Sequence, residues 1–483
     1  MGFTSVVFLF VFFPAAILGY YLFWYLERKV VHFKGRRLSD GLLVLESLAF
    51  YACSGVSGLI GLCLYVIGLW VLGKNIQHCR ERKKSAKGLL FTGILLLTAV
   101  LYYFKYYNFT LEILRRFYGE NANLLPVTWS MLGISFITFS AISYLVDIYR
   151  GDVQAGTFLD MALYVTFFPK VASGPLILWK DFKKNLPVRI FNESRFLYGI
   201  NRFILGFFKK VVLADALGMV VADIQSQTAS GIDMPTAWGC TFLYFLQIYY
   251  DFSGYSDTAI GLAAMYGFDV KENFHFPYIS QSVSEFWRRW HISLGTWFRE
   301  YVYIPLGGNR KGFTKTLRNL FLVFLLTGIW HGAGIGYLLW GVIHGICTVA
   351  ERCIREKKFY TRVPGIVKWA CTMFIVMMGW QFFRISSMTE NLEFWRILFG
   401  AVKFETVNFT WEYYFTAKTL FLAGIGAIGA VLPALPGLRI YQQKMAESRI
   451  GNVVQEIALF ALFAVTIMCM VNSTYSPFIY FQY

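Results

Sequence analysis

Long apolar runs without charge are the feature of this sequence that most restricts the folds it can adopt. Residues 319–350 contain no Asp, Glu, Lys or Arg, although they hold two histidines, His331 and His344. About 20 apolar residues are enough for one helix to cross a bilayer. Apolar segments recur along the whole chain, several of them shorter than a full crossing, at 3–25, 42–72, 89–103, 132–148, 161–168, 238–250, 258–266, 320–330, 337–350, 366–383, 419–435 and 457–471. The long run at 42–72 is broken by Gly55, Gly58 and Gly61.

The composition agrees with a membrane protein. The chain is 57% hydrophobic and 15% charged, whereas soluble proteins are about 25% charged. The shorter segments are expected to be re-entrant or tilted, because their backbone must be covered by protein or by a water-filled cavity. We therefore predict an all-α integral membrane protein with roughly ten to twelve membrane helices and re-entrant segments. The first apolar stretch lacks a basic leader and a cleavage site, so it is predicted to be a retained helix.

The net charge of +17 lies mainly in short loops at 27–37, 74–88 and 307–319. Short loops rich in Lys and Arg mark the cytoplasmic side of a membrane protein. This placement predicts a multi-pass protein of the plasma membrane in contact with lipid, and argues against a nucleic-acid partner. The eight cysteines are scattered without a CxxC pair, so we predict neither a disulfide framework nor a metal site.

Two carboxylates, Asp251 and Asp257, interrupt the apolar run in "IYYDFSGYSDTAIGLAAM". A carboxylate that faces lipid costs several kcal/mol, so both are predicted to face the protein interior or an aqueous cavity. The structural interpretation is that they accept hydrogen bonds from Tyr hydroxyls and backbone amides at a break between two helices. A direct role in chemistry is the alternative.

The segment "SVSEFWRRWHISLGTWFREYVYIP", residues 282–305, is predicted to form one amphipathic helix at the membrane interface, with cations near headgroups and aromatic rings facing inward. Glu285 is expected to pair with Arg288 or Arg289, three or four residues later on the same helix face. Taken alone, His291 in this segment is interpreted as an interfacial histidine.

The loop "PLGGNRKG" follows directly and carries Arg310 and Lys311 beside three glycines. Backbone N–H groups and cations in such a loop can bind phosphate, although the loop matches no P-loop pattern. The alternative is that these cations only set the orientation of the chain in the membrane.

Several longer motifs resemble the membrane-bound O-acyltransferase (MBOAT) family, and within it the bacterial branch of alginate O-acetyltransferase-like proteins. The most specific is "FWRRWHISLGTWFREYVYIPLGG" followed about forty residues later by "GIWHG". The others are "YYFKYYNF", "LGISFITFSAISYLVDIYRGD", "YVTFFPKVASGPLILWKDF", "GFFKKVVLADALG" and the terminal "SPFIYFQY". The resemblance covers essentially the whole chain, so we expect a single domain at 1–483 with its family core at about 100–350.

The resemblance implies a multi-helix fold around a transmembrane tunnel, with the acyl donor entering from the cytoplasm and the acceptor reached from the other side. The catalytic histidine of the family corresponds to His331, and its second histidine corresponds to His291. Acyl transfer from a thioester to a hydroxyl needs a base, and a neutral imidazole suits that task near neutral pH. His344 is expected to be structural. The remaining expected polar residues of the tunnel or its supports are Asp251, Asp257, Trp330 and Arg288.

The predicted activity is O-acetylation of envelope or secreted polysaccharide in a bacterial plasma membrane. Acetyl-CoA would be the donor substrate, with its phosphates near Arg310 and Lys311, and no cofactor is expected to stay bound. The resemblance also implies an extracytoplasmic SGNH-type acyltransferase partner that completes the transfer onto the polymer. The alternatives are the sister branch that transfers D-alanine to teichoic acid, a proton-coupled transporter or flippase that uses intramembrane Asp and His, and a membrane scaffold that only binds. The chain shows no internal repeat of the kind common in transporters.

Overall fold

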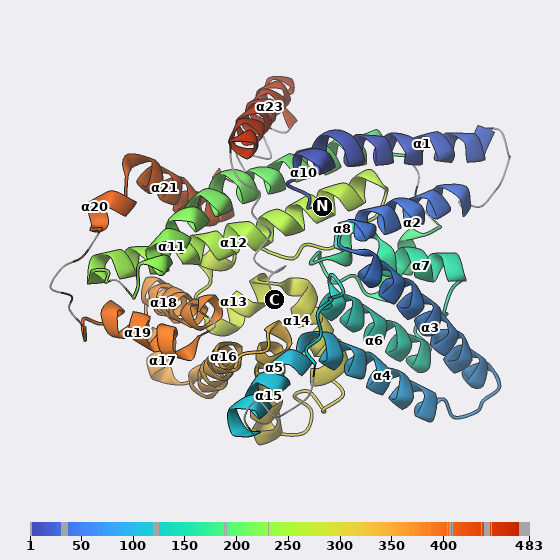
Figure 1. Ribbon diagram of the computed structural model, residues 1–483, viewed down its shortest axis with the longest axis horizontal. Helices are drawn as coiled ribbons and strands as arrows, with labels where there is room; N and C mark the ends of the chain where they lie inside the picture. The colour runs from blue at the N-terminus through green and yellow to red at the C-terminus, as the bar shows by residue number, and fades with distance from the viewer. Residues whose placement is uncertain are drawn as a thin grey trace. The chain divides into compact units, whose positions relative to one another are not determined.

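The computed structural model describes residues 2–472 except 30–36, 119–124, 188, 190, 230, 386, 403, 405–406, 408, 436, 439–444 and 446. The terminal motif at 476–483 and most of the basic loop at 27–37 therefore lie outside the described residues. Every regular element in the described part of the chain is a helix (Figure 1), which confirms the predicted all-α class. These helices pack as two compact units, Met1–Phe203 with Thr258–Lys271, and Ile204–Asp257 with Glu272–Tyr483.

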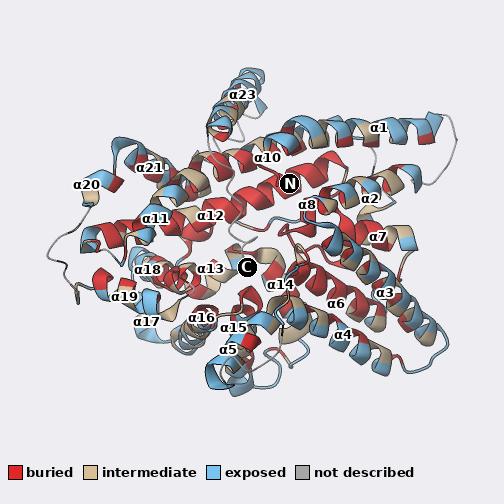
Figure 2. Cartoon of the chain, viewed as in Figure 1, coloured by how far each residue is buried: buried red, intermediate tan, exposed pale blue. Residues whose placement is uncertain are grey.

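Six described helical segments are long and apolar enough to cross a membrane: Phe8–Lys29, Val56–Glu81, Lys87–Lys105, Gly365–Arg384, Ala417–Ala434 and Arg449–Val471. The other predicted segments are helical too, but they are shorter or more polar. Helix α6 (Ile134–Arg150) is an example, since nearly all of its residues are buried, as Figure 2 shows. A helix that is apolar all round is typical of a position enclosed by protein.

Of two expected interruptions of apolar runs, the structure has the one at Gly55 and lacks the other. The apolar run at 42–72 is divided into α2 (Arg37–Ala52) and α3 (Val56–Glu81), because Gly55 adopts a φ of 128° that suits glycine. Conversely, the predicted segments 238–250 and 258–266 belong to one continuous helix of 32 residues, α12 (Met234–Met265). The predicted helix break between Asp251 and Asp257 was therefore wrong.

The first unit is built around α6, which packs against α3, α4 (Lys87–Lys105) and α9 (Trp179–Asn185). Buried aromatic rings fill its centre, and the Tyr164 hydroxyl donates a hydrogen bond of 2.8 Å to the Ile177 carbonyl. Its further helices are α1 (Phe13–Lys29), α5 (Tyr107–Tyr118), α7 (Phe158–Thr166), α8 (Phe168–Val171) and the first part of α10 (Glu193–Phe208).

The second unit holds both histidine motifs. Its core includes four tryptophans, here called the tryptophan cluster: Trp287, Trp290, Trp340 and Trp380. Its helices are η2 (Lys209–Asp215), α11 (Ala216–Ser226), most of α12, η3 (Pro277–Ile279), α13 (Val283–Arg289), α14 (Ile292–Phe298), η4 (Arg299–Tyr303), α15 (Phe313–His331), α16 (Ile335–Ile354), α17 (Lys358–Arg362), α18 (Gly365–Arg384), α19 (Met388–Leu398), α20 (Trp411–Tyr414), α21 (Ala417–Val431), η5 (Leu432–Ala434) and α23 (Arg449–Val471).

Candidate active site

His331 is the last residue of α15, where the chain turns back into α16. Its side chain is buried, and its ring lies between aromatic neighbours from three helices. The ring centroids are 4.9 Å from Trp330, 5.0 Å from Trp340 of α16 and 5.0 Å from Phe383 of α18. The apolar sequence around His331 therefore forms a wall of aromatic rings around its imidazole.

Glycines allow α15 and α16 to pack closely as an antiparallel pair. A Cβ atom on Gly328 would lie 2.5 Å from the Tyr337 carbonyl oxygen and 3.1 Å from the Gly341 Cα atom. A Cβ atom on Gly336 would lie 2.5 Å from the Phe382 carbonyl oxygen of α18. These glycines therefore let neighbouring helices approach each other and so fix the position of the helix end that carries His331.

His291 lies at a break between α13 and α14, so the predicted single helix over 282–305 was wrong. Its backbone adopts the left-handed conformation with φ 48° and ψ 51°. Its Nδ1 atom lies 3.2 Å from the Asn273 Oδ1 atom, and its ring meets that of Phe252 edge-on at 4.6 Å. His291 lies outside the six candidate spans, and burial lowers the pKa of its imidazole to about 3. The ring is therefore neutral near pH 7.

Trp330 connects the two predicted catalytic histidines. Its ring centroid is 6.2 Å from that of His291 and 4.9 Å from that of His331. The structure thus brings together residues that are forty positions apart in the sequence, around an indole that was itself predicted to belong to the site.

His344 lies in α16 and is completely buried. The indole N–H of Trp287 donates a hydrogen bond of 3.4 Å to its Nδ1 atom. A Cβ atom on Gly379 of α18 would lie 2.6 Å from its Nε2 atom. His344 is thus hydrogen-bonded to α13 and packed closely against α18.

Asp251 and Asp257 are both buried, as predicted, but their partners are lysines. The Lys210 Nζ atom lies 2.6 Å from Asp251 Oδ1 and 2.7 Å from Asp215 Oδ1. The Lys209 Nζ atom lies 2.6 Å from Asp257 Oδ2. These ion pairs join η2 to α12.

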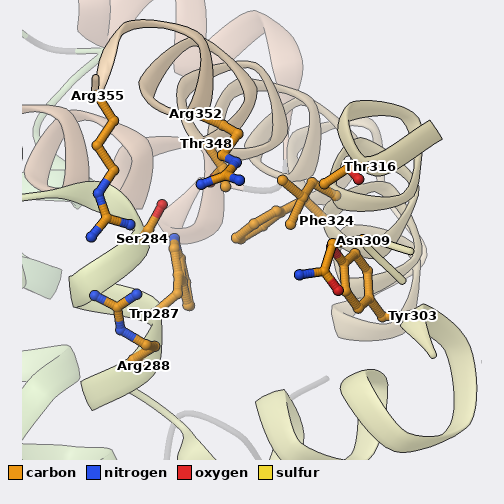
Figure 3. A pocket seen from close by; sticks show the side chains of 11 residues that line it. Ser284, Trp287, Arg288, Tyr303, Asn309, Thr316, Phe324, Thr348, Arg352 and Arg355 are labelled. Atoms are coloured by element: carbon orange, nitrogen blue, oxygen red, sulfur yellow. The ribbon is translucent and has the colours of Figure 1, made fainter. Parts of the chain in front are cut away.

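A pocket of about 360 Å³ opens between α13, α15 and α16. Arg288, Arg352 and Arg355 bring three guanidinium groups to it, and none of them pairs with a carboxylate among the described residues. Figure 3 shows these groups on the same side as Ser284 and Trp287, with Asn309 and Tyr303 opposite. Such a lining suits an anionic ligand that also has apolar surface.

The predicted donor residues Arg310 and Lys311 are exposed and are not part of this lining. Asn309 of the same loop does line the pocket. Arg288 was predicted as a polar residue of the tunnel or its supports, and it lines the pocket. Of the two predicted partners of Glu285, Arg289 forms the ion pair, at 2.8 Å. Arg352 and Arg355 are absent from the predicted set, although the basic run "ERCIREKK" at the end of α16 is a visible signal for them.

The aromatic rings of the tryptophan cluster connect this pocket to His331. Trp287 lines the pocket, its ring lies 5.2 Å from that of Trp340, and Trp340 lies 5.0 Å from His331. Phe324 also lines the pocket and precedes His331 by seven residues in α15, which is about 10 Å along a helix axis. The pocket and His331 are therefore two ends of one aromatic wall.

Known proteins with similar sequences agree with these features. Residues 69–390 match the model of the MBOAT, membrane-bound O-acyltransferase family. A probable alginate O-acetylase of Pseudomonas putida is 38% identical over all of both chains. A peptidoglycan O-acetyltransferase of Helicobacter pylori is 31% identical over 84% of this chain and 80% of its own length. A teichoic acid D-alanyltransferase of Bacillus subtilis is 28% identical over 68% of this chain and 84% of its own length.

The matched region contains His291, His331 and all three arginines of the pocket. With the candidate spans, it confirms the predicted multi-pass location in a bacterial inner membrane. The relatives are named for acyl transfer to three different polymers, so acyl transfer is what they share. The chain is thus an acyltransferase and belongs to the membrane-bound O-acyltransferase family.

Proposed function

We propose that this enzyme transfers an acetyl group from cytoplasmic acetyl-CoA through a tunnel to a hydroxyl on the other side of the membrane, with His331 as the general base. The observation that carries the proposal is the arrangement along α15 and α16. The arginine-lined pocket lies near the N-terminal part of α15, next to the basic loop 307–319. The buried His331 lies at the C-terminal end of the same helix.

The pocket supports a donor with phosphate groups. Guanidinium groups bind phosphate through charge-assisted, often bidentate hydrogen bonds. Arg288, Arg352 and Arg355 would hold the phosphates, and the ring of Trp287, which also lines the pocket, would pack against the thioester arm. Loop 307–319 is predicted to be cytoplasmic, and the antiparallel packing of α15 and α16 brings Arg352 and Arg355 to the same side of the membrane.

His331 would act on the acceptor hydroxyl. As the hydroxyl oxygen attacks the thioester carbonyl, a C–O bond forms, the C–S bond breaks, and the imidazole takes the hydroxyl proton. That proton then passes to the departing thiolate, which restores the neutral ring. A general base of this kind contributes roughly 10²–10⁴-fold to a rate.

The acceptor we propose is an envelope or secreted polysaccharide, reached through an extracytoplasmic SGNH-type acyltransferase partner. Support comes from relatives named alginate O-acetylase and peptidoglycan O-acetyltransferase, which match a larger share of this chain than the D-alanyltransferases do. The greater coverage of the alginate O-acetylase also favours acetyl over D-alanyl transfer.

The test is replacement of His331 by Gln, which keeps a polar side chain but cannot act as a base. We expect the acetyl content of the exported polysaccharide to fall by roughly 10²-fold or more, at normal protein abundance. His344→Gln is the matched control, because a Gln oxygen can still accept the hydrogen bond from Trp287. Near-normal acetylation by a well-expressed His331→Gln variant would show that the base is a different residue.

A further inference from the structure

Asn273 lies in the loop between α12 and α13 and is completely buried. Its side chain contacts three residues from different parts of the second unit. Its Nδ2 atom donates a hydrogen bond of 3.1 Å to the Ser256 hydroxyl of α12. Its Oδ1 atom faces both Ser293 of α14 and the Nδ1 atom of His291.

The orientation of the Asn273 amide follows from its contact with Ser293. The backbone N–H of Ser293 lies 3.1 Å from Oδ1, and its hydroxyl lies 2.8 Å from the same atom. A backbone N–H can only donate, so the side-chain atom that faces it must be the oxygen. The opposite amide orientation would place two donors against each other.

This orientation fixes the position of the proton on His291. A carboxamide oxygen only accepts hydrogen bonds, so the Nδ1 atom of His291, 3.2 Å away, must carry the proton. In the neutral ring the lone pair then belongs to Nε2. We propose that Asn273 is a positioning residue that holds His291 in the Nδ1–H tautomer, so that Nε2 is the accepting nitrogen that His291 offers to the reaction.

The backbone around Asn273 makes this arrangement rigid. The N–H of Ile292 donates to the Asn273 carbonyl at 2.9 Å, and the N–H of His275 donates to the Arg289 carbonyl at 2.9 Å. These bonds hold His291 in its left-handed conformation, which a non-glycine residue keeps only when its surroundings impose it. The edge-on contact with Phe252 restricts rotation of the ring.

The proposal rests on the proposed acyl transfer and adds a role for the second histidine. With His331 as the base that takes the hydroxyl proton, the Nε2 lone pair of His291 supplies a second acceptor for a hydrogen bond from the substrates, whereas the other tautomer would present a donor there. The ionisable groups on the elements around His291 include Asp251 and Asp257 of α12, each paired with a lysine, and Glu272 and His275 of the loop that carries Asn273. Helix α13 adds Arg288 and the pair of Glu285 with Arg289, and α15 adds Lys315, Arg318 and His331.

Two substitutions of Asn273 separate positioning from simple structural support. Asn273→Leu has a similar size but offers no acceptor, so kcat should fall roughly 10–100-fold with little change in KM. Asn273→Asp keeps the acceptor and should retain activity within about tenfold. Its negative charge favours the imidazolium and raises the pKa of His291, so the acid limb of the pH–rate profile should move to higher pH.

Control variants test the effect of burial alone. Ser293→Ala removes one hydroxyl from Oδ1 but keeps the backbone N–H, so its effect should be small. Asn319→Leu replaces another fully buried asparagine, whose Nδ2 atom donates to the Gly308 carbonyl. If Asn273→Leu lowers kcat no more than Asn319→Leu, and Asn273→Asp leaves the pH profile unmoved, the positioning role is overturned.

Nitrogen-15 NMR of the full-length protein with labelled histidines reports the tautomer of His291 and does not depend on an activity measurement. The chain has six histidines, so His291→Gln identifies the signals of His291 by difference. We expect a protonated Nδ1 and an unprotonated Nε2 in the wild type, and loss of this pattern in Asn273→Leu. A protonated Nε2 in active wild-type enzyme would overturn this proposal and leave the proposed function intact. If the wild-type protein has the expected His291 tautomer but shows no acyl transfer, only the proposed function is overturned.

Discussion

At the scale of single residues, the buried ion pairs of α12 show what the sequence can and cannot predict. The burial of Asp251 and Asp257 follows from the cost of placing a carboxylate in lipid. Their partners do not follow from it, because Lys210 is 41 positions away from Asp251 in the sequence. The two lysines belong to "GFFKKVVLADALG". This motif alone does not indicate that the lysines pair with α12, because the pairing arises only when η2 packs against α12.

The Lys210 ion pairs give the first stability prediction. Removing one partner of a buried pair leaves an uncompensated charge and costs about 3–5 kcal/mol. Lys210→Met should therefore lower the free energy of unfolding by about that amount, measured by thermal unfolding in detergent. Lys209→Met should cost less, because its side chain is 27% exposed and that of Lys210 is 1% exposed.

The same pair offers an internal check on this prediction. The double variant Lys210→Met with Asp251→Asn removes both charges of the closer pair, so it should recover part of the lost stability. Equal stability of Lys210→Met and Lys209→Met would show that the ion pair of Lys210 is not what stabilises the contact between η2 and α12.

At the scale of helices, the antiparallel contact between α15 and α16 determines where His331 lies. Gly328→Ala would force a Cβ atom against the Tyr337 carbonyl and Gly341. Overpacking of this kind typically costs about 1–3 kcal/mol. We expect Gly328→Ala to lower both the thermal stability and the rate of acyl transfer, because it displaces the helix end that carries His331, the proposed base.

Gly424→Ala is the matched control, since Gly424 lies within α21 and a Cβ atom there would meet nothing within 4 Å. Alanine forms helices better than glycine by up to about 1 kcal/mol, so this variant should be neutral or slightly more stable. If Gly328→Ala behaved like Gly424→Ala, the close approach of α15 and α16 would not be what positions His331.

Helix boundaries near the site show a limit of prediction from periodicity. The segment 282–305 has the apolar spacing of one helix, yet the chain breaks at His291. The cause is a set of hydrogen bonds from the separate segment at Asn273 and His275. A local pattern cannot reveal a partner that lies outside it, so both the break and Asn273 were missed.

At the scale of the whole molecule, the sequence was sufficient for the all-α membrane class and for the two histidine motifs. The apolar composition and the placement of charges predict the all-α membrane class, and the motif residues indicate the family. The sequence favoured Arg310 and Lys311 for the donor phosphates because they stand beside glycines, whereas the arginines that line the pocket, Arg352 and Arg355, lie at the end of an ordinary helix. Only the packing of α13, α15 and α16 brings Arg288, Arg352 and Arg355 together.

The topology can be tested by cysteine labelling after the eight native cysteines are replaced. Cysteine at Lys84 or Lys311, both exposed in basic loops, should resist an impermeant maleimide applied to intact cells, because these loops are predicted to be cytoplasmic. Cysteine at exposed Thr389 should react, because it follows the candidate span Gly365–Arg384 on the other side. Labelling of Lys311 from outside would contradict the proposed donor side.

The most direct test of the account uses membrane vesicles of opposite sidedness and radiolabelled acetyl-CoA, which does not cross the bilayer. Inverted vesicles expose the cytoplasmic face, so label added outside should reach polysaccharide inside them. Right-side-out vesicles should incorporate almost none.

In inverted vesicles, Arg352→Ala and Arg355→Ala should raise the apparent KM for acetyl-CoA with little change in the saturated rate. His331→Gln should abolish incorporation at any donor concentration. Equal incorporation in right-side-out vesicles, or in inverted vesicles that contain His331→Gln, would contradict acyl transfer from the cytoplasm by His331.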